Sequence, residues 1–260
     1  MEVLSPHNLE EALQIKAEHP EALPIQGGTD VMVALNFDRA RPQTVLNLNE
    51  VAELRGWSRS NGELRLGAGL TYSEAMRAEL VELVPALAEA ARTVGSPQIR
   101  NRGTVGGNLG TASPAGDALP PLVVERAEVE CVSTRGSRRL PVTDFVIGVK
   151  RTALEPDELI AAVWLRPSQA PQTFLKVGPR NAMVIAVISL AVSAGDELRA
   201  SFGSASPRPV LVSAPLDDAD TFPERVAEAA APIDDVRGTS QYRRHALRVM
   251  TERALKRVLV

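Results

Sequence analysis

The chain has 260 residues, of which 44% are hydrophobic and 23% charged, as expected for a folded globular protein and not for a disordered one. Its formal net charge is −3 and only 3% of the residues are aromatic, so neither an electrostatic nor a base-stacking surface for nucleic acid is expected. The single cysteine, Cys131, excludes an internal disulfide, a cysteine-bound iron–sulfur cluster and a cysteine zinc site within these residues.

No targeting or membrane segment is predicted. Residues 1–11 are polar and amphipathic and lack the apolar centre of a signal peptide. The longest uncharged run, 181–195, is too short to cross a bilayer, and we interpret it as buried core. These patterns predict a cytoplasmic protein without a membrane span.

The predicted elements begin with a capped, one-sided apolar helix over 5–15. An extended piece at 24–26 leads into a Gly-Gly-Thr-Asp turn and an apolar run that ends at Leu35. Strands are predicted over 44–48 and 63–70. A helical region follows over 71–94, in which Pro85 breaks or restarts the helix.

Residues 95–121 differ in kind, because six glycines and four prolines fall within them. This density predicts that no regular helix survives there. Interleaved apolar residues such as Ile99 and Leu109 favour an ordered loop over a disordered one. Long irregular segments in compact domains are commonly functional.

The pattern then returns to regular structure. Strands are predicted over 128–133 and 157–165, the second alternatively as a helix-to-strand segment. Two prolines make 167–172 the best candidate for a linker. Beyond it, extended segments at 174–177 and 197–203 flank the apolar run from Ala182, and helices are predicted over 221–231 and 242–259.

The first segment with chemical potential runs from Pro24 to Val31 and contains Gly27, Gly28 and Thr29. Glycines let a ligand approach the backbone closely, and successive backbone N–H groups in such a turn can bind an anion. The alternatives are an ordinary turn and, for Asp30, a helix cap.

The second segment is Thr104-Val105-Gly106-Gly107-Asn108, followed at some distance by Asp117. Its glycines allow the same close approach of a ligand as in the first segment, and its hydroxyl and amide groups can form hydrogen bonds. Asp117 could accept a hydrogen bond from a ribose hydroxyl. Alternatively, Asp117 caps a helix that begins near Ala118. Two such segments favour a dinucleotide pyrophosphate held from two sides.

Better-known motifs are missing from the sequence. It contains no helix-opening Gly-x-Gly-x-x-Gly, no P-loop, no Gly-x-Ser-x-Gly elbow and no His-Glu-x-x-His. A Rossmann dinucleotide site, a P-loop nucleotidase, an α/β-hydrolase and a zinc protease of that type are therefore not expected.

Taken in order, these segments resemble the FAD-binding (medium) subunit of molybdenum hydroxylases, the family of xanthine dehydrogenase and aerobic carbon monoxide dehydrogenase. The resemblance covers nearly the whole chain, through residues 27–30, 98–117, 145–154, 157–160, 174–182 and 236–245. It implies an α+β FAD-binding domain of the vanillyl-alcohol-oxidase (PCMH) type over 1–166, with subdomains at about 1–53 and 54–166. A small α+β C-terminal domain is implied over 172–260.

The resemblance implies non-covalent FAD between the two subdomains, since neither glycine segment contains a histidine or cysteine that could form a covalent link. The implied contacts comprise a pyrophosphate cradle, a ribose or ribitol contact, two apolar ring contacts and a cation near the flavin. Asp117 is the implied ribose or ribitol contact, Val94 and Ile160 are the ring contacts, and Lys176 is the cation. The implied pyrophosphate cradle consists of Pro24, Ile25, Gln26, Gly27, Gly28, Thr29, Asp30, Val31, Thr104, Val105, Gly106, Gly107 and Asn108.

These implied roles have alternatives in the residues themselves. Val94 and Ile160 could be plain core, and Lys176 a solvated surface lysine. A lysine near the flavin would stabilise the anionic reduced form. Arg243 and Arg244 are predicted on a solvated helix face or, alternatively, in a subunit contact, and Cys131 is predicted to be a small buried hydrophobe.

The implied function is that of an oxidoreductase subunit. Electrons from a molybdenum cofactor on a large subunit would pass through [2Fe–2S] clusters on a small subunit to FAD on this chain, and then to NAD, a quinone or oxygen. No catalytic acid or base and no metal ligand are expected here. The alternatives are a stand-alone FAD reductase of the cell-wall precursor type, which needs a proton donor that the sequence does not identify, and a flavinless scaffold subunit.

Two departures from the family pattern stand out. A single cysteine excludes the extra cluster-binding loop of relatives that reduce aromatic acyl-CoA thioesters. Val184 and Ile185 stand in a stretch where many relatives carry an acidic residue.

Overall fold

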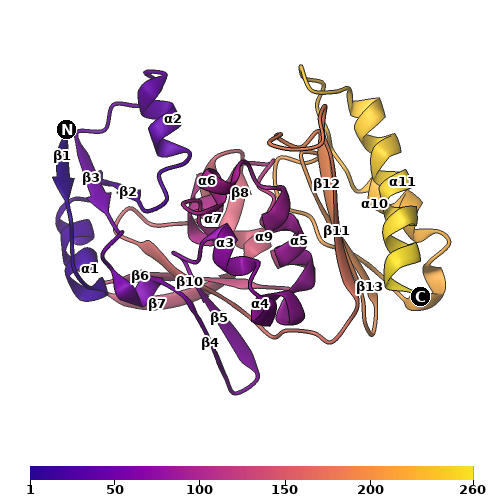
Figure 1. Ribbon diagram of the computed structural model, residues 1–260, viewed down its shortest axis with the longest axis horizontal. Helices are drawn as coiled ribbons and strands as arrows, with labels where there is room; N and C mark the ends of the chain where they lie inside the picture. The colour runs from indigo at the N-terminus through magenta and orange to yellow at the C-terminus, as the bar shows by residue number, and fades with distance from the viewer. Residues whose placement is uncertain (260) are drawn as a thin grey trace.

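Three sheets follow one another along the long axis of the molecule, from the N-terminal end to the C-terminal end (Figure 1). The computed structural model describes residues 1–259. The first sheet is parallel, and the other two are antiparallel. A two-stranded ribbon, β8 (Val146–Gly148) with β9 (Arg151–Thr152), lies outside these sheets.

The N-terminal sheet has the strand order β1-β3-β2. Its strands and their connecting helices are β1 (Glu2–Leu4), α1 (Leu9–Glu18), β2 (Leu23–Ile25), α2 (Val31–Asn36) and β3 (Thr44–Asn47). Parallel neighbours need long crossovers, and both helices serve that purpose. The side chain of Asn8 accepts a hydrogen bond from the backbone of Glu11, so α1 begins later than the sequence predicts.

The middle sheet has the order β4-β5-β10-β6-β7. Its strands are β4 (Trp57–Ser60), β5 (Glu63–Gly67), β6 (Glu128–Ser133), β7 (Gly136–Pro141) and β10 (Leu159–Leu165). The predicted strand at 128–133 is confirmed, and Cys131 within it is fully buried, as predicted. Two short elements border this sheet, η1 (Ala52–Leu54) and α9 (Val142–Phe145).

The helical region after β5 consists of α3 (Tyr72–Ala75), α4 (Ala78–Leu83) and α5 (Pro85–Thr93). Pro85 occupies the first turn of α5, so it restarts the helix as the sequence suggests. Thr71 and Glu74 form a reciprocal capping box that starts α3. These helices pack on the middle sheet and bury leucines of α4 and α5 in its core.

The prediction that no regular helix survives in 95–121 is wrong. The segment contains α6 (Pro97–Arg100), α7 (Val105–Thr111) and α8 (Leu119–Val124). Pro97, Pro120 and Pro121 stand in first turns, where no N–H is needed, and Pro114 lies in the turn between α7 and α8. The glycines of α7 are kept helical by tertiary packing, since a Cβ on Gly106 would lie 2.6 Å from the backbone oxygen of Ala68.

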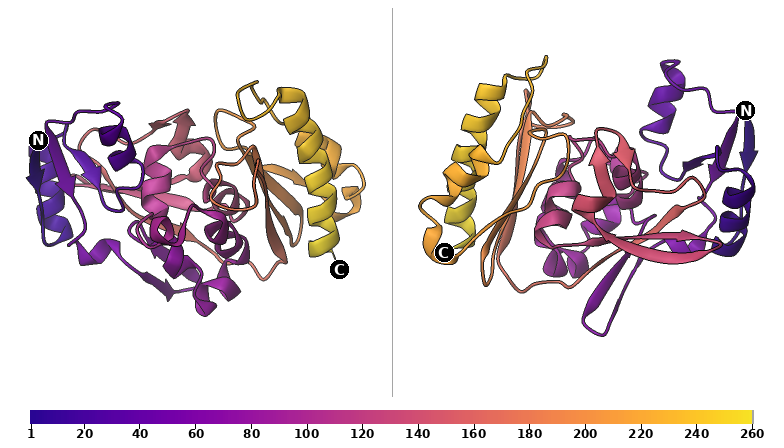
Figure 2. Two further views of the ribbon diagram at one scale, coloured as in Figure 1. Left: turned by 45° about the horizontal axis from the view of Figure 1, so that its top comes forward. Right: turned by 180° about the vertical axis from the view of Figure 1, so that it is seen from behind.

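The C-terminal sheet has the order β11-β12-β13-β14. Its strands are β11 (Gln172–Val177), β12 (Ile188–Ala194), β13 (Leu198–Gly203) and β14 (Val212–Ala214), followed by η2 (Leu216–Asp218), α10 (Phe222–Glu228) and α11 (Ser240–Val258). The C-terminal helices, yellow in Figure 2, cover the outer face, while α5 and α8 pack on the inner face. Every residue of β12 is buried as a consequence.

Two predictions in this part are corrected. The run 181–195 is buried core only in its second half, because residues before β12 such as Met183 and Ile185 are exposed. Arg243 is not on a solvated face: it is 2% exposed, pairs with Asp235 and donates to the carbonyl oxygen of Ser204. Its guanidinium ties the segment before α11 to the end of β13, whereas Arg244 is exposed.

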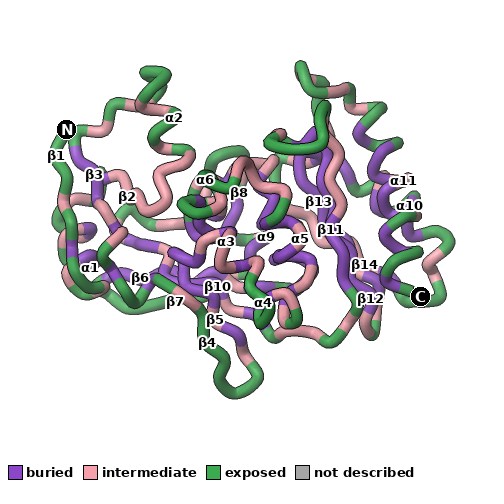
Figure 3. The backbone as a smooth tube through the Cα atoms, in the orientation of Figure 1, coloured by how far each residue is buried: buried purple, intermediate pink, exposed green. Residues whose placement is uncertain are grey.

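Helix α2 stands apart from this packing. None of its residues is buried, and the tube of Figure 3 is green and pink there, in contrast to the purple core of the sheets. A small cluster that includes Ala86, Phe174 and Ala191 joins α5 to the C-terminal sheet. Residues 166–171 carry neither helix nor strand, and the division of the chain at this segment stays a prediction.

Candidate cofactor-binding site

A cavity of about 570 Å³ lies between the turn after β2, the start of α7 and the beginning of β10. Protein sites for small molecules and cofactors are commonly 300–1,000 Å³ in volume. The cavity is therefore large enough for an extended cofactor. The segment 183–185, before β12, contributes to its lining from the C-terminal part of the chain.

The structure brings the two glycine segments together in this cavity, although they are far apart in the sequence. All the predicted site residues line it except Val105 and Lys176, namely Pro24, Ile25, Gln26, Gly27, Gly28, Thr29, Asp30, Val31, Val94, Thr104, Gly106, Gly107, Asn108, Asp117 and Ile160. Val105 instead packs, fully buried, in the hydrophobic core of the middle sheet. The N–H of Val105 is not free for a ligand either, since it donates to the carbonyl oxygen of Leu70.

The turn after β2 is shaped by Gly28, whose φ of 74° lies in the left-handed region. Its backbone approaches the chain before α7 so closely that a Cβ on Gly27 would lie 2.2 Å from the carbonyl oxygen of Arg102. Among the described residues, the N–H groups of Gly27, Gly28 and Thr29 donate no hydrogen bond. These donors border the cavity and are available to an anionic ligand.

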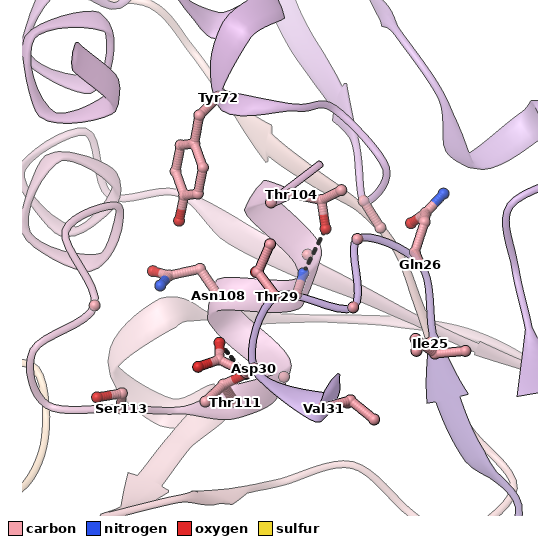
Figure 4. A pocket seen from close by; sticks show the side chains of 18 of the residues that line it. Ile25, Gln26, Thr29, Asp30, Val31, Tyr72, Thr104, Asn108, Thr111 and Ser113 are labelled. Atoms are coloured by element: carbon pink, nitrogen blue, oxygen red, sulfur yellow. Dashed lines mark hydrogen bonds between the residues drawn. The ribbon is translucent and has the colours of Figure 1, made fainter. Parts of the chain in front are cut away.

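The start of α7 is fixed by Thr104, whose hydroxyl accepts a hydrogen bond of 2.9 Å from the N–H of Gly107 (Figure 4). The N–H of Gly106 donates to Ala68 at 2.8 Å, which pins the helix to the end of β5. Around Gly107, a Cβ would meet only the Thr104 hydroxyl, at 2.9 Å. The absence of a side chain at Gly107 therefore keeps the cavity open to the backbone.

A side-chain contact joins the two segments. The hydroxyl of Thr111, in the last turn of α7, donates to a carboxylate oxygen of Asp30 at 3.2 Å (Figure 4). Asp30 stands at the N-cap position of α2 but makes no side-chain cap bond. Its carboxylate therefore links the turn to α7 and does not fill the capping role considered above.

Two buried oxygens at the cavity lack a partner. The side-chain Oδ1 atoms of Asn108 and Asp117 accept no hydrogen bond among the described residues. Buried polar atoms without a partner are rare in native proteins and usually mark a site where a ligand or water binds. Hydroxyl groups of a sugar or sugar alcohol would satisfy both oxygens.

The other oxygen of Asp117 forms a buried ion pair with Lys176 of β11, at 2.5 Å. The two side chains are 8% and 6% exposed, so Lys176 is not the solvated lysine of the alternative interpretation. Its ammonium also donates to the carbonyl oxygen of Thr93 at 3.2 Å. Burial raises the pKa of the Asp117 carboxyl above its ordinary value, although the Lys176 ammonium acts in the opposite direction.

Sequence reasoning missed several lining residues, among them the polar Tyr72 and Glu158. The phenol group of Tyr72 points into the cavity in Figure 4. Burial raises the pKa of the Tyr72 hydroxyl, and the carboxylates of Asp117 and Asp30 raise it further, so the hydroxyl stays protonated and can donate. No local pattern marks Tyr72, because only the tertiary fold brings α3 to α7. Leu154 and Leu159 also line the cavity without having been predicted.

The fold and the cavity are those of a cofactor-binding protein whose site offers free backbone N–H donors to an anionic group. Residues 1–167 match the family model described as the FAD binding domain in molybdopterin dehydrogenase, and the chain belongs to this family. The predicted fold class is thereby confirmed, and FAD is the cofactor that the family binds. The lining contains no histidine or cysteine, in agreement with non-covalent binding.

Relatives extend over nearly the whole chain. The xanthine dehydrogenase FAD-binding subunit of Escherichia coli O157:H7 is 30% identical over 268 residues, which cover 95% of this chain and 92% of the relative. The nicotinate dehydrogenase FAD-subunit of Eubacterium barkeri is 35% identical over 195 residues, 72% of this chain and 66% of the relative.

Solved structures share the fold. A chain of quinoline 2-oxidoreductase from Pseudomonas putida 86 matches with a TM-score of 0.91 at 26% identity, covering 100% of this chain and 97% of that one. A chain of a Cu,Mo-CO dehydrogenase matches with a TM-score of 0.91 at 23% identity over 99% and 97% of the two chains. The chain is thus an FAD-binding subunit of the molybdenum hydroxylase family.

The Thr104 cap gives a first testable consequence. We expect Thr104→Ala to cost about 1 kcal/mol of folding stability, as lost caps do, and also to weaken FAD binding, because the first turn of α7 borders the cavity. FAD affinity is measured by fluorescence titration of the FAD-free chain, and stability by urea denaturation.

Thr239→Ala is the matched control. The hydroxyl of Thr239 caps α11 through the N–H of Tyr242 in the same way, but Thr239 is outside the cavity. The control should lose stability while keeping its FAD affinity. Equal losses of affinity in both variants would mean that α7 has no special role in binding.

Proposed function

We propose that this chain is the electron-transfer subunit of a molybdenum-containing hydroxylase or dehydrogenase complex. It would receive electrons from iron–sulfur clusters on a small partner subunit, which in turn take them from a molybdenum cofactor on a large subunit. Family membership supports this proposal, and so do relatives named as an FAD-subunit and as a medium chain. The partners and the direction of electron flow belong to the proposal.

The residues of the chain would each take a defined part in holding FAD. N–H groups of the turn at Gly27–Thr29 would bind the pyrophosphate, and the free oxygens of Asn108 and Asp117 would accept from hydroxyl groups. Val94 and Ile160 would pack against its rings. When bound, FAD supplies electron uptake and release that amino-acid side chains do not provide.

The acidic groups of the cavity favour an electron relay over a stand-alone reductase. Glu158 lies between two donor groups of Arg138, each at 2.8 Å, and these hydrogen bonds lower the pKa of its carboxyl. Asp117 is paired with Lys176, and Asp30 accepts from Thr111. Each of the three lining carboxylates thus has a partner within the chain, which supports a role in binding more than a role in proton transfer to a substrate.

The test uses the assembled complex. A complex rebuilt with the FAD-free chain should still be reduced by its substrate at the metal centres, as seen in the iron–sulfur absorbance, but it should no longer reduce its outside acceptor. Adding FAD should restore that transfer. Undiminished reduction of the acceptor by the FAD-free complex would contradict the proposal.

A further inference from the structure

The two faces of the C-terminal sheet differ in chemistry. The outer face, towards α10 and α11, belongs to an apolar core that contains Leu190, Val192 and Phe202. The inner face, towards α5 and α8, carries mainly small and polar side chains. Strand pairing places on the inner face Gln172, Phe174, Lys176, Ser189, Ala191, Ser193, Arg199, Ser201 and Gly203.

Little apolar surface joins this inner face to the two helices. Among the described residues, the apolar cluster between them comprises Ala86, Ala90, Val124, Phe174 and Ala191. Three of its five members are alanines. On the same face, three serine hydroxyls of β12 and β13 are buried without a hydrogen-bond partner in the part of the chain that the structure describes. Contacts between parts of a chain that are not large and hydrophobic commonly permit relative motion.

Two carboxylates next to the sheet hold the beginning of β11, which stands beside α5 in Figure 1. Glu89 of α5 accepts a hydrogen bond of 2.6 Å from the N–H of Phe174. Glu125, which follows α8, accepts from the N–H and the hydroxyl of Ser168, at 3.2 and 3.0 Å, and from the side-chain amide of Gln172. None of these five residues lines the cofactor cavity.

A third carboxylate, that of Asp117, belongs both to the contact with the sheet and to the cofactor cavity. One of its oxygens pairs with Lys176 of β11, and the other has no partner among the described residues. A hydrogen bond from a ligand to the second oxygen would stabilise the ionised carboxylate, and only the ionised carboxylate forms the ion pair with Lys176. Both contacts therefore favour the same charge state of one residue.

We propose that FAD binding and the docking of the C-terminal sheet are coupled through Asp117, so that the sheet is held firmly on α5 and α8 only when the cavity is occupied. The inference rests on the part of Asp117 in the proposed function and extends it to residues outside the cavity. Val184 and Ile185, which precede β12, line the same cavity and would give FAD a direct contact with this part of the chain. Such coupling is reciprocal, so a sheet that docks less firmly lowers the affinity for FAD by the same factor.

The first test is amide hydrogen exchange of the FAD-free and the FAD-loaded chain, resolved to single residues. We expect FAD to slow exchange at the N–H groups of Ser168 and Phe174 about fivefold or more, because coupled sites typically change each other's equilibria about 5–150-fold. Both N–H groups donate to carboxylates at the sheet contact, and neither residue lines the cavity. The paired amides of β6 and β7, also outside the cavity, are the internal control and should change less.

The second test is the FAD affinity of Glu125→Gln. The substitution puts an amide donor opposite the donor groups of Ser168, outside the cavity, and should weaken FAD binding about fivefold or more. Glu89→Gln, at the other contact with β11, should act in the same direction and serves if the first variant does not fold. Glu130→Gln is the matched control, since Glu130 accepts from the indole N–H of Trp164 at 2.7 Å within the middle sheet, also outside the cavity.

Several outcomes would overturn the coupling. Exchange at Ser168 and Phe174 that is the same with and without FAD would do so, and so would equal slowing in β6 and β7, which would assign the effect to global stability. FAD affinities of Glu125→Gln and Glu89→Gln equal to that of the control would also contradict it. Flavin absorbance of the same samples separates this failure from that of the proposed function: a chain that takes up no FAD would overturn both, whereas normal uptake with unchanged exchange would overturn the coupling alone.

Discussion

Replacing Gly107 by valine is expected to abolish FAD retention. The backbone at Gly107 is helical, a conformation that other residues adopt, but the Thr104 hydroxyl that caps α7 would have to shift to admit a Cβ. A Cβ there would meet the Thr104 hydroxyl at 2.9 Å and otherwise point into open space at the cavity. The added methyl groups would occupy the volume in which the cofactor contacts the backbone.

Gly28→Val should have the same outcome through a second cause. Its φ of 74° disfavours a β-branched residue, so the turn that presents the N–H groups would change shape. Gly148→Ala is the control, because a Cβ at Gly148 would meet only Arg151, at 3.9 Å, and Gly148 is outside the cavity. Flavin-to-protein ratios after gel filtration decide the question, and full occupancy in the Gly107 variant would contradict the cradle.

Breaking the pair between Asp117 and Lys176 is expected to have the second large effect. Lys176→Met would leave the Asp117 carboxylate 8% exposed and without its ammonium partner. Removing one partner of a buried ion pair commonly costs about 3–5 kcal/mol of folding stability. Combining Lys176→Met with Asp117→Asn should recover much of this loss, because no uncompensated charge then remains.

The loss should depend on pH in a definite direction. Without Lys176, burial raises the folded-state pKa of Asp117 still further above its unfolded value of about 3.9. Between these two pKa values the folded state binds more protons, so stability falls as the pH rises. The loss of folding stability in Lys176→Met, relative to the unchanged chain, is therefore larger at neutral pH than at a pH near the unfolded-state pKa of Asp117.

Urea denaturation at both pH values measures this deficit. Arg126→Met is the control, since Arg126 pairs with Glu197 on the surface with 59% and 35% of the two side chains exposed. Surface pairs of this kind contribute about 0–1 kcal/mol. A deficit in the Lys176 variant no larger than that of the control would show that the buried pair contributes little to folding.

Much of the fold follows from local patterns. The alternation over 128–133 predicts β6, and the spacing of apolar residues around Pro85 predicts a helical region with a restart at that proline. The two glycine segments mark most of the cavity lining, because close approach to backbone requires glycine wherever it occurs. These features depend on the residues themselves and on their near neighbours.

The remainder depends on contacts between distant segments. Helix α7 forms in spite of its glycines because Gly106 packs against Ala68. Lys176 is buried because it meets Asp117, 59 residues away in the chain. Tyr72 enters the cavity only through the placement of α3, and Arg243 is buried by partners that precede α11. Single-sequence patterns carry no information on such pairings.

The central claim is that the cavity between the two glycine segments holds FAD without a covalent bond. The most direct measurement is the visible absorption spectrum of the purified chain, before and after acid precipitation. We predict a flavin spectrum that moves entirely into the supernatant as FAD. A chain that stays colourless after incubation with FAD would contradict the claim and would favour a flavinless scaffold subunit.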